Sequence, residues 1–175
     1  MKNNTKNLCL SAFFAVVIAM SAFIKIPIGI VPMTLQTMTV MLVALVLGAK
    51  YGFLSVLLYI GLGLLGLPVF ANGAGLSYVL QPSFGYLLGF LATSVFVGYC
   101  KTKINSFASL LLVCSIGLGI LYFCGISYYV FLQIYVYQNY FVWPYILYSF
   151  ALVFIPTDLL SCVIAIQLYK RIKRK

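Results

Sequence analysis

The sequence predicts an all-α integral membrane protein: a single membrane domain over residues 1–175, with six transmembrane helices and two structured outer loops. The first observation behind this prediction is composition, because 65% of the residues are hydrophobic and 7% are charged. Such a chain has too little polar surface to cover a water-soluble globule. The second is length, since a spanning helix needs roughly 20 apolar residues. The third is that the basic residues fall between or beyond the apolar runs.

Turn residues between the apolar runs indicate where the predicted helices begin and end. The first helix is expected to end before Pro27, because proline interrupts a helix. Lys50 and Gly52 predict a tight turn, and the stretch 68–82 is too polar and glycine-rich to continue a span. Pro156 suits the first turn of the last helix, where its missing N–H is unpaired in any case. The predicted helices cover 8–24, 34–48, 51–67, 83–100, 106–135 and 156–169.

An aromatic segment at 136–154 lies between the last two predicted helices. It is rich in tyrosine and includes Trp143. Amphipathic rings of this kind gather where a membrane meets water. We therefore expect this segment to lie at the membrane interface, with one short helix after Pro144.

The basic residues predict the orientation in the membrane. With six spans and a cytoplasmic N-terminus, Lys25 alone of the 11 basic residues falls outside. Cytoplasmic segments carry such an excess of lysine and arginine. The sequence thus predicts a multi-pass protein of the cytoplasmic membrane with both termini in the cytoplasm and both irregular loops outside. The residues predicted inside are Lys2, Lys6, Lys50, Lys101, Lys103, Lys170, Arg171, Lys173, Arg174 and Lys175.

Several classes of function are excluded by residues that the chain lacks. The formal charge of +10 comes without a basic stripe interleaved with aromatics on a polar segment, so nucleic acid is not indicated. There is no histidine and one acidic residue, Asp158, which rules out a His-based triad and a multi-carboxylate metal site. The phosphate-binding motif Gly-x-x-x-x-Gly-Lys-Ser/Thr is also missing. We therefore expect no enzyme, no ATPase activity and no bound cofactor or metal.

Asp158 is the first candidate for contact with a ligand. It is expected in the first turn of the last helix, where the positive end of the helix dipole favours an anion. An acid at the centre of a span costs about 2.5–3.5 kcal/mol, and irregular backbone at membrane depth persists only where protein or a water-filled cavity satisfies it. We expect Asp158 to contact a ligand beneath a lid formed by the two loops, with a helix-capping carboxylate as the alternative.

Several motifs follow one another in a characteristic order. They are Ile26-Pro-Ile-Gly-Ile-Val-Pro-Met-Thr-Leu-Gln36, Gly48-Ala-Lys-Tyr-Gly-Phe-Leu-Ser55, Gly66-Leu-Pro-Val-Phe70, Gly85-Tyr-Leu-Leu-Gly-Phe90 and Phe154-Ile-Pro-Thr-Asp158. In this set the chain resembles the BioY family, the biotin-specific subunits of energy-coupling-factor (ECF) transporters. The resemblance implies high-affinity capture of biotin and its uptake as the substrate-specific subunit of an ECF-type ABC transporter.

The resemblance also implies residues that bind the ligand. Asp158 matches the family's aspartate, whereas the lysine that usually follows three residues later is Ser161 here and carries over only as a position. A biotin site needs acceptors for the ureido N–H groups and donors for the ureido carbonyl and the carboxylate. Further residues able to supply these groups are Gln36, Asn72, Gln81 and Tyr86.

Each of these additional residues has a structural alternative. Gln36 is as suited to bracing a loop, Gln81 and Asn72 are typical turn residues, and Tyr86 suits a membrane interface. Lys25 is placed to compensate for the missing lysine, but we interpret it as an ordinary juxtamembrane lysine.

Small residues form a stripe on the first predicted helix: Ser11, Ala15, Ala19 and Ala22. Such a stripe lets another helix approach closely. The resemblance implies that it docks on the transmembrane coupling subunit, and packing within this bundle is the alternative. The resemblance further implies two ATPase subunits, which use ATP to drive uptake.

Two alternatives to biotin capture stay open. One keeps the architecture and changes the ligand to another small vitamin. The other is a membrane protein with a structural role and no transport function. A channel is not favoured, because no polar stripe of the kind that lines a pore occurs on several helices.

Overall fold

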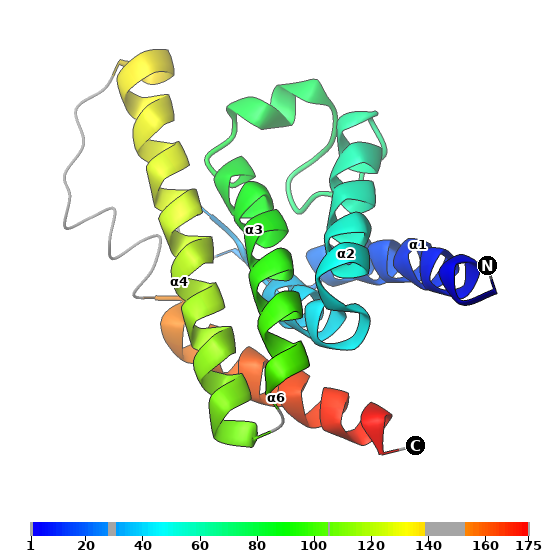
Figure 1. Cartoon of the computed structure of the whole chain (residues 1–175). Helices are drawn as coiled ribbons and strands as arrows, with labels where there is room; N and C mark the ends of the chain where they lie inside the picture. Colours follow the sequence, from blue (N-terminus) through cyan, green and yellow to red (C-terminus); the bar gives the residue numbers. More distant parts are fainter. Residues whose placement is uncertain (1, 28–30, 105, 139–152, 175) are drawn as a thin grey trace.

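The computed structural model describes residues 2–27, 31–104, 106–138 and 153–174, which form a helical bundle with one small hairpin (Figure 1). The long helices are α1 (Lys2–Phe23), α2 (Gln36–Leu64), α3 (Phe84–Cys100), α4 (Phe107–Leu132) and α6 (Ile155–Lys173). The short elements are β1 (Lys25–Ile26), β2 (Met33–Thr34), the 3-10 helices η1 (Leu76–Leu80) and η2 (Lys101–Lys103), and the π-helix η3 (Gln133–Tyr137). In Figure 1, α3 and α4 lie side by side, and α6 crosses the lower part of the bundle.

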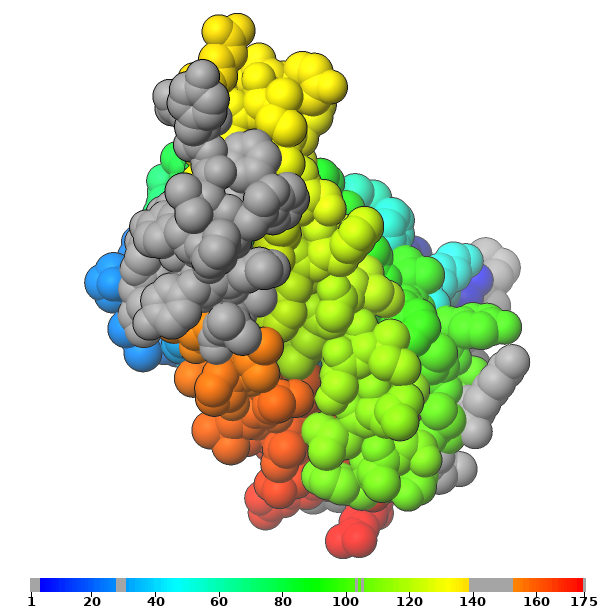
Figure 2. Space-filling view, turned by 90° about the vertical axis from the view of Figure 1, so that its left-hand side faces the viewer, coloured from blue at the N-terminus to red at the C-terminus, as the bar shows by residue number. Residues whose placement is uncertain are grey.

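Some of the long helices are apolar over lengths that suit a bilayer. Within the described residues, three are long and apolar enough to cross a membrane: Asn4–Phe23, Gln36–Leu64 and Phe107–Tyr137. Phe84–Cys100 is apolar but shorter. Figure 2 shows the face on which α4 and α6 lie together, and α4 directs large apolar side chains such as Phe123 outward. Several such helices in one chain define a multi-pass membrane protein.

α2 departs from the prediction of two helices at 34–48 and 51–67 joined by a turn. The structure has one element, Gln36–Leu64, with non-helical backbone at Gly48 (φ 80°, ψ −179°). Glycine adopts a positive φ with little strain, so a kink at this residue replaces the expected turn. The element also ends at Leu64, three residues earlier than predicted.

Lys101, at the end of α3, satisfies backbone groups next to this kink. Its Nζ donates to the carbonyl oxygens of Leu45 (2.6 Å) and Val46 (2.9 Å), at the end of the first part of α2, where carbonyls lack helical partners. The ammonium also lies 5.8 Å from the ring centroid of Tyr169 on α6. Burial, with a smaller contribution from Lys173, lowers the pKa of Lys101. One side chain thus joins α2, α3 and α6.

Lys101→Met is expected to destabilise the protein by about 1–3 kcal/mol, because the two carbonyls lose their donor. Thermal unfolding of the purified protein in detergent measures the effect. Lys50→Met is the control, since Lys50 is exposed and surface substitutions usually change stability by less than about 0.5 kcal/mol. Equal unfolding temperatures for the two variants would show that Lys101 does not hold the kink.

The small residues of α1 face the interior of the bundle. Ser11, Ala15 and Ala22 have exposed fractions of 0%, 2% and 0%, and Ala19 is half-buried. α1 packs on α2, and the Ser11 hydroxyl donates to the Tyr51 carbonyl at 3.1 Å. Close approach of α1 to α2 covers Ser11, Ala15 and Ala22, so packing within this bundle, the alternative to a partner-docking stripe, accounts for these three residues.

The first predicted loop contains a short antiparallel hairpin. β1 and β2 pair with Lys25 opposite Thr34 and Ile26 opposite Met33. The Thr34 hydroxyl donates to Gln36 Oε1 at 3.1 Å. The hairpin is thereby tied to the first turn of α2.

The second predicted loop is held against α2 by aromatic side chains. A bridge between Phe70 and Gly73 closes its first turn. The Phe70 ring, 2% exposed, contacts Tyr59 of α2 and Tyr78 of η1, with centroid distances of 5.5 and 4.4 Å. Aromatic pairs at these distances contribute about 0.5–1.5 kcal/mol beyond their burial. The loop is therefore a packed part of the fold.

Two helical elements, η3 and α6, lie on either side of the aromatic segment in the sequence. η3 continues α4 to Tyr137. Most of the segment expected at the interface, with Trp143 and the short helix predicted after Pro144, lies outside the described residues. α6 has Pro156 in its first turn and extends to Lys173, past the predicted end at residue 169. Basic residues in its last turn suit the negative end of the helix dipole.

Candidate functional site

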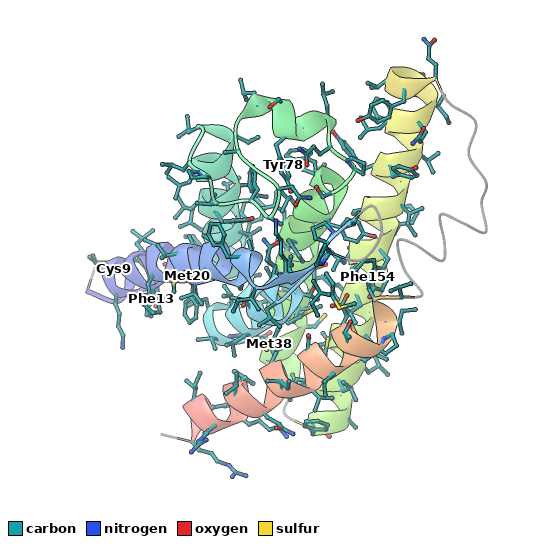
Figure 3. All side chains as sticks on the ribbon, turned by 180° about the vertical axis from the view of Figure 1, so that it is seen from behind. Cys9, Phe13, Met20, Met38, Tyr78 and Phe154 are labelled. Carbon is teal, nitrogen blue, oxygen red and sulfur yellow. The ribbon has the colours of Figure 1, made fainter. Side chains whose placement is uncertain are left out.

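A cavity lies where both loops meet the helices. Its empty volume, which includes open solvent at the mouth, is about 540 Å³. Figure 3 labels two of its residues, Tyr78 from η1 and Phe154 at the start of α6. The lining residues are Val31, Pro32, Met33, Thr34, Gln36, Thr37, Ala71, Tyr78, Ser83, Tyr86, Leu87, Phe90, Leu121, Tyr122, Phe154 and Asp158.

Asp158 supplies the acidic group of this cavity from the first turn of α6, as predicted. Its exposed fraction is 6%. The Tyr122 hydroxyl of α4 donates to Oδ2 at 2.7 Å, and Thr37 of α2 forms a second side-chain hydrogen bond to the carboxylate. A carboxylate has about four lone-pair positions, so two donors leave it able to accept hydrogen bonds from a ligand.

Gln36 combines both roles that the sequence left open. Its Nε2 donates to the Tyr59 hydroxyl at 2.8 Å, which in turn donates to the Val69 carbonyl of the second loop at 3.3 Å. Gln36 therefore braces the loop. It also lines the cavity, so its amide is close to any ligand held there.

Tyrosine and serine hydroxyls form the part of the wall nearest the second loop. The Ser83 hydroxyl donates to the Tyr78 hydroxyl at 3.0 Å. Burial raises the pKa of Tyr78, so its hydroxyl stays protonated and able to donate at neutral pH. Tyr86 lies close enough to interact with Asp158 electrostatically. A Cβ added to Gly125 of α4 would lie 2.7 Å from the Tyr86 ring, so this glycine makes room for it.

Three predicted site residues lie outside this cavity. Asn72 is exposed in the turn after Phe70, and Gln81 is half-buried beyond η1; neither lines the cavity. The reason is that the second loop turns Phe70 and Tyr78 inward. Ser161 lies one turn along α6 from Asp158 and faces a different space.

That space is an apolar groove of about 640 Å³. It shares Met33, Thr34 and Asp158 with the cavity, so the two spaces meet at the hairpin. Its other lining residues are Ile24, Ile26, Leu35, Met38, Thr157, Leu160, Ser161 and Ile164. Ser161 therefore lines a mainly apolar wall.

Sequence reasoning missed five polar residues of the cavity: Thr34, Thr37, Tyr78, Ser83 and Tyr122. Tyr122 lies 36 residues before Asp158, in the middle of an apolar helix. No local pattern distinguishes this tyrosine from the others in the chain. Ser83 and Thr37 stand at helix starts, where capping explains such residues equally well.

The fold and the cavity define a class: a multi-pass membrane protein with a partly open cavity between two packed loops and its helices. The whole chain, residues 1–175, matches the model of the BioY family. The chain belongs to the BioY family.

Similar proteins were found by sequence. A probable biotin transporter BioY of Lysinibacillus sphaericus is 49% identical over 105 residues, which cover 60% of this chain and 54% of that protein. The alignment thus spans about half of that relative. The biotin transporter BioY of Thermotoga maritima is 45% identical over 69% of this chain and 72% of its own length. A biotin transporter BioY of Lactococcus lactis is 33% identical over 100% of this chain and 95% of its own length.

A solved structure has the same fold. It is the crystal structure of the S-component for biotin from an ECF-type ABC transporter. The TM-score is 0.83 with 30% sequence identity, over 99% of this chain and 94% of that chain. The all-helical architecture of this chain is therefore an S-component fold.

Proposed function

We propose that this chain captures biotin and serves as the substrate-specific subunit of an ECF-type ABC transporter. The observation that carries the proposal is the cavity around the buried Asp158, in a BioY-family chain with the fold of a biotin S-component. The chain is a transporter subunit and not an enzyme. Its one acidic residue contacts the ligand and performs no reaction.

The cavity has the groups that the biotin ring system requires. Asp158 accepts hydrogen bonds from ureido N–H groups, since its carboxylate has free acceptor positions. Gln36 and Tyr86 supply polar contacts to the ureido carbonyl, together with the serine and tyrosine hydroxyls of the wall. Leu87, Phe90 and Leu121 form apolar surface for the fused rings. The ligand lies beneath the hairpin and the second loop.

The proposed topology has six spans, with the two parts of α2 on either side of Gly48 counted separately. Both termini lie in the cytoplasm. The kink places Lys50 and Lys101 close together, and basic residues also end α6. This end of the bundle is the cytoplasmic one by the excess of positive charge. The hairpin and the second loop then face outward.

Energy for uptake comes from partner subunits in this proposal. The sequence contains no phosphate-binding loop motif, so ATP is used by two ATPase subunits joined to this chain through a transmembrane coupling subunit. The chain itself binds no cofactor. Its partners are biotin, the lipid bilayer and that ECF module.

Titration calorimetry of biotin into the purified, detergent-solubilised chain tests the proposal. Saturable binding at one site is expected, together with an increase in unfolding temperature, because a ligand that binds only the folded state stabilises it. Failure of biotin to bind well-folded protein would refute the assignment. Stabilisation by a different vitamin would then identify the ligand.

Tyr122→Phe is expected to weaken biotin binding about two- to twelvefold. The change removes the hydroxyl that donates to Asp158, and a hydrogen bond contributes about 0.5–1.5 kcal/mol. Tyr135→Phe is the matched control, because Tyr135 is exposed in η3. Calorimetry compares the two dissociation constants. Identical values would show that Tyr122 does not orient the carboxylate.

A further inference from the structure

Lys25 of β1 connects the hairpin to the second loop at the edge of the cavity. Its Nζ donates to the Ala71 carbonyl oxygen and, at 3.2 Å, to Asn72 Oδ1. Ala71 is part of the cavity wall. The ammonium therefore lies next to the wall, between two neutral acceptors.

Lys25 is exposed and is not itself part of the cavity wall. It pairs with Thr34, and residues directly opposite each other in an antiparallel pair project to the same face. Thr34 lines both the cavity and the apolar groove. The bond from Nζ to the carbonyl of Ala71, a residue of the wall, thus places the ammonium at the solvent-exposed edge of the cavity.

An anionic ligand in the cavity lies near the negative charge of Asp158, so a cation nearby would favour its binding. Among the described residues that line the cavity, Asp158 is the charged one. A ligand with a carboxylate therefore brings a second negative charge into the cavity. Ser161 is neutral and lines the apolar groove. Three other cations have contacts away from the cavity: Lys101 bonds to Leu45 and Val46, Lys170 lies over the Phe107 ring, and Lys173 lies near Lys101.

We propose that Lys25 binds the carboxylate of the ligand and so determines the preference of this site for an acid. This inference rests on the proposed function, which supplies a ligand with a carboxylate. Hydrogen bonds between two charged groups are roughly twice as strong as neutral ones. The carboxylate therefore displaces the Asn72 amide as a partner of Nζ. Because Lys25 already contacts Ala71, this bond holds the hairpin and the second loop together over the bound ligand.

The experiment compares two ligands and three variants by calorimetry in detergent. The ligands are biotin and biotinol, in which a neutral alcohol replaces the carboxylate. The variants are Lys25→Met, which removes the charge, Lys25→Arg, which keeps it, and the control Lys50→Met, on an exposed lysine elsewhere. The unsubstituted protein is expected to bind biotin at least about tenfold more tightly than biotinol. Lys25→Met should abolish that preference by weakening biotin alone, whereas Lys25→Arg and Lys50→Met should keep it.

Three results would overturn the inference. Equal affinity of the unsubstituted protein for biotin and biotinol would show that no cation contacts the carboxylate, and this measurement needs no variant to fold. Biotin binding unchanged in Lys25→Met would assign the carboxylate to another group. An equal loss of affinity for both ligands in Lys25→Met would show that Lys25 only connects the hairpin to the second loop. Absence of biotin binding to the unsubstituted protein is distinguishable, because it refutes the proposed function itself and this inference with it.

Discussion

Asp158→Asn is expected to weaken biotin binding by about 100-fold. Hydrogen bonds to a charged group contribute about 1.5–3 kcal/mol, and about 1.4 kcal/mol corresponds to a factor of ten in affinity. Asparagine has nearly the same shape but has one acceptor oxygen and no charge. Its amide NH₂ also meets donors, because Tyr122 and Thr37 both hydrogen-bond the carboxylate. The variant therefore has fewer acceptors for the ligand, and its amide NH₂ faces other hydrogen-bond donors of the cavity wall.

Calorimetry with biotin measures this effect, and Gln167→Ala is the control. Gln167 lies exposed on the same helix, so its truncation should leave the dissociation constant unchanged. Unaltered affinity in a well-folded Asp158→Asn protein would show that the carboxylate does not contact the ligand. The cavity around it would then not be the biotin site.

Gly98→Ala is expected to destabilise the protein by about 3 kcal/mol, the largest effect on the fold that we predict. A Cβ at this position would lie 2.4 Å from the Ala49 nitrogen and 2.5 Å from the Gly48 carbonyl carbon. These are backbone atoms, so no side-chain rotation relieves the overlap. α2 and α3 must separate, and added methyl groups in tightly packed regions cost about 1–3 kcal/mol or more. Separation also pulls Lys101 away from the kink.

Thermal unfolding in detergent compares this variant with Gly119→Ala. Gly119 lies in α4, and a Cβ there would meet no atom within 4 Å. Both changes add the same methyl group within a helix, where alanine is favoured over glycine by about 1 kcal/mol. The control should therefore match or exceed the stability of the unsubstituted protein. Equal stability of the two variants would show that α2 and α3 are not in close contact at Gly98.

Prediction from the sequence succeeded where the signal is local. The described residues of the polar, proline- and glycine-rich segments, 25–27, 31–34 and 68–82, are irregular in the structure except for short elements. Pro156 starts α6, and Asp158 occupies its first turn. Each of these features depends on a backbone preference of nearby residues, which a single sequence shows directly.

Local sequence patterns do not show the outcome where residues distant in the chain decide it. The stripe on α1 is visible in the sequence, but only packing shows that α2 covers it. Asn72 and Gln81 are polar residues in the right loop, yet Phe70 and Tyr78 take the inward positions. Tyr122 became a site residue only because α4 passes α6 beside Asp158.

The sequence by itself determined that this protein belongs in a membrane, and which single residue carries negative charge within it. The hydrophobic composition indicates the membrane, and the dipole at the start of a helix favours an acidic residue there. Neither signal depends on which residues pack against the helix. Only the tertiary structure decided which hydroxyls surround Asp158, that Ser161 faces an apolar groove, and that Lys25 reaches the cavity edge. Those contacts arise where helices and loops distant in the chain meet, and the side chains that meet there are set by packing geometry that no local pattern encodes.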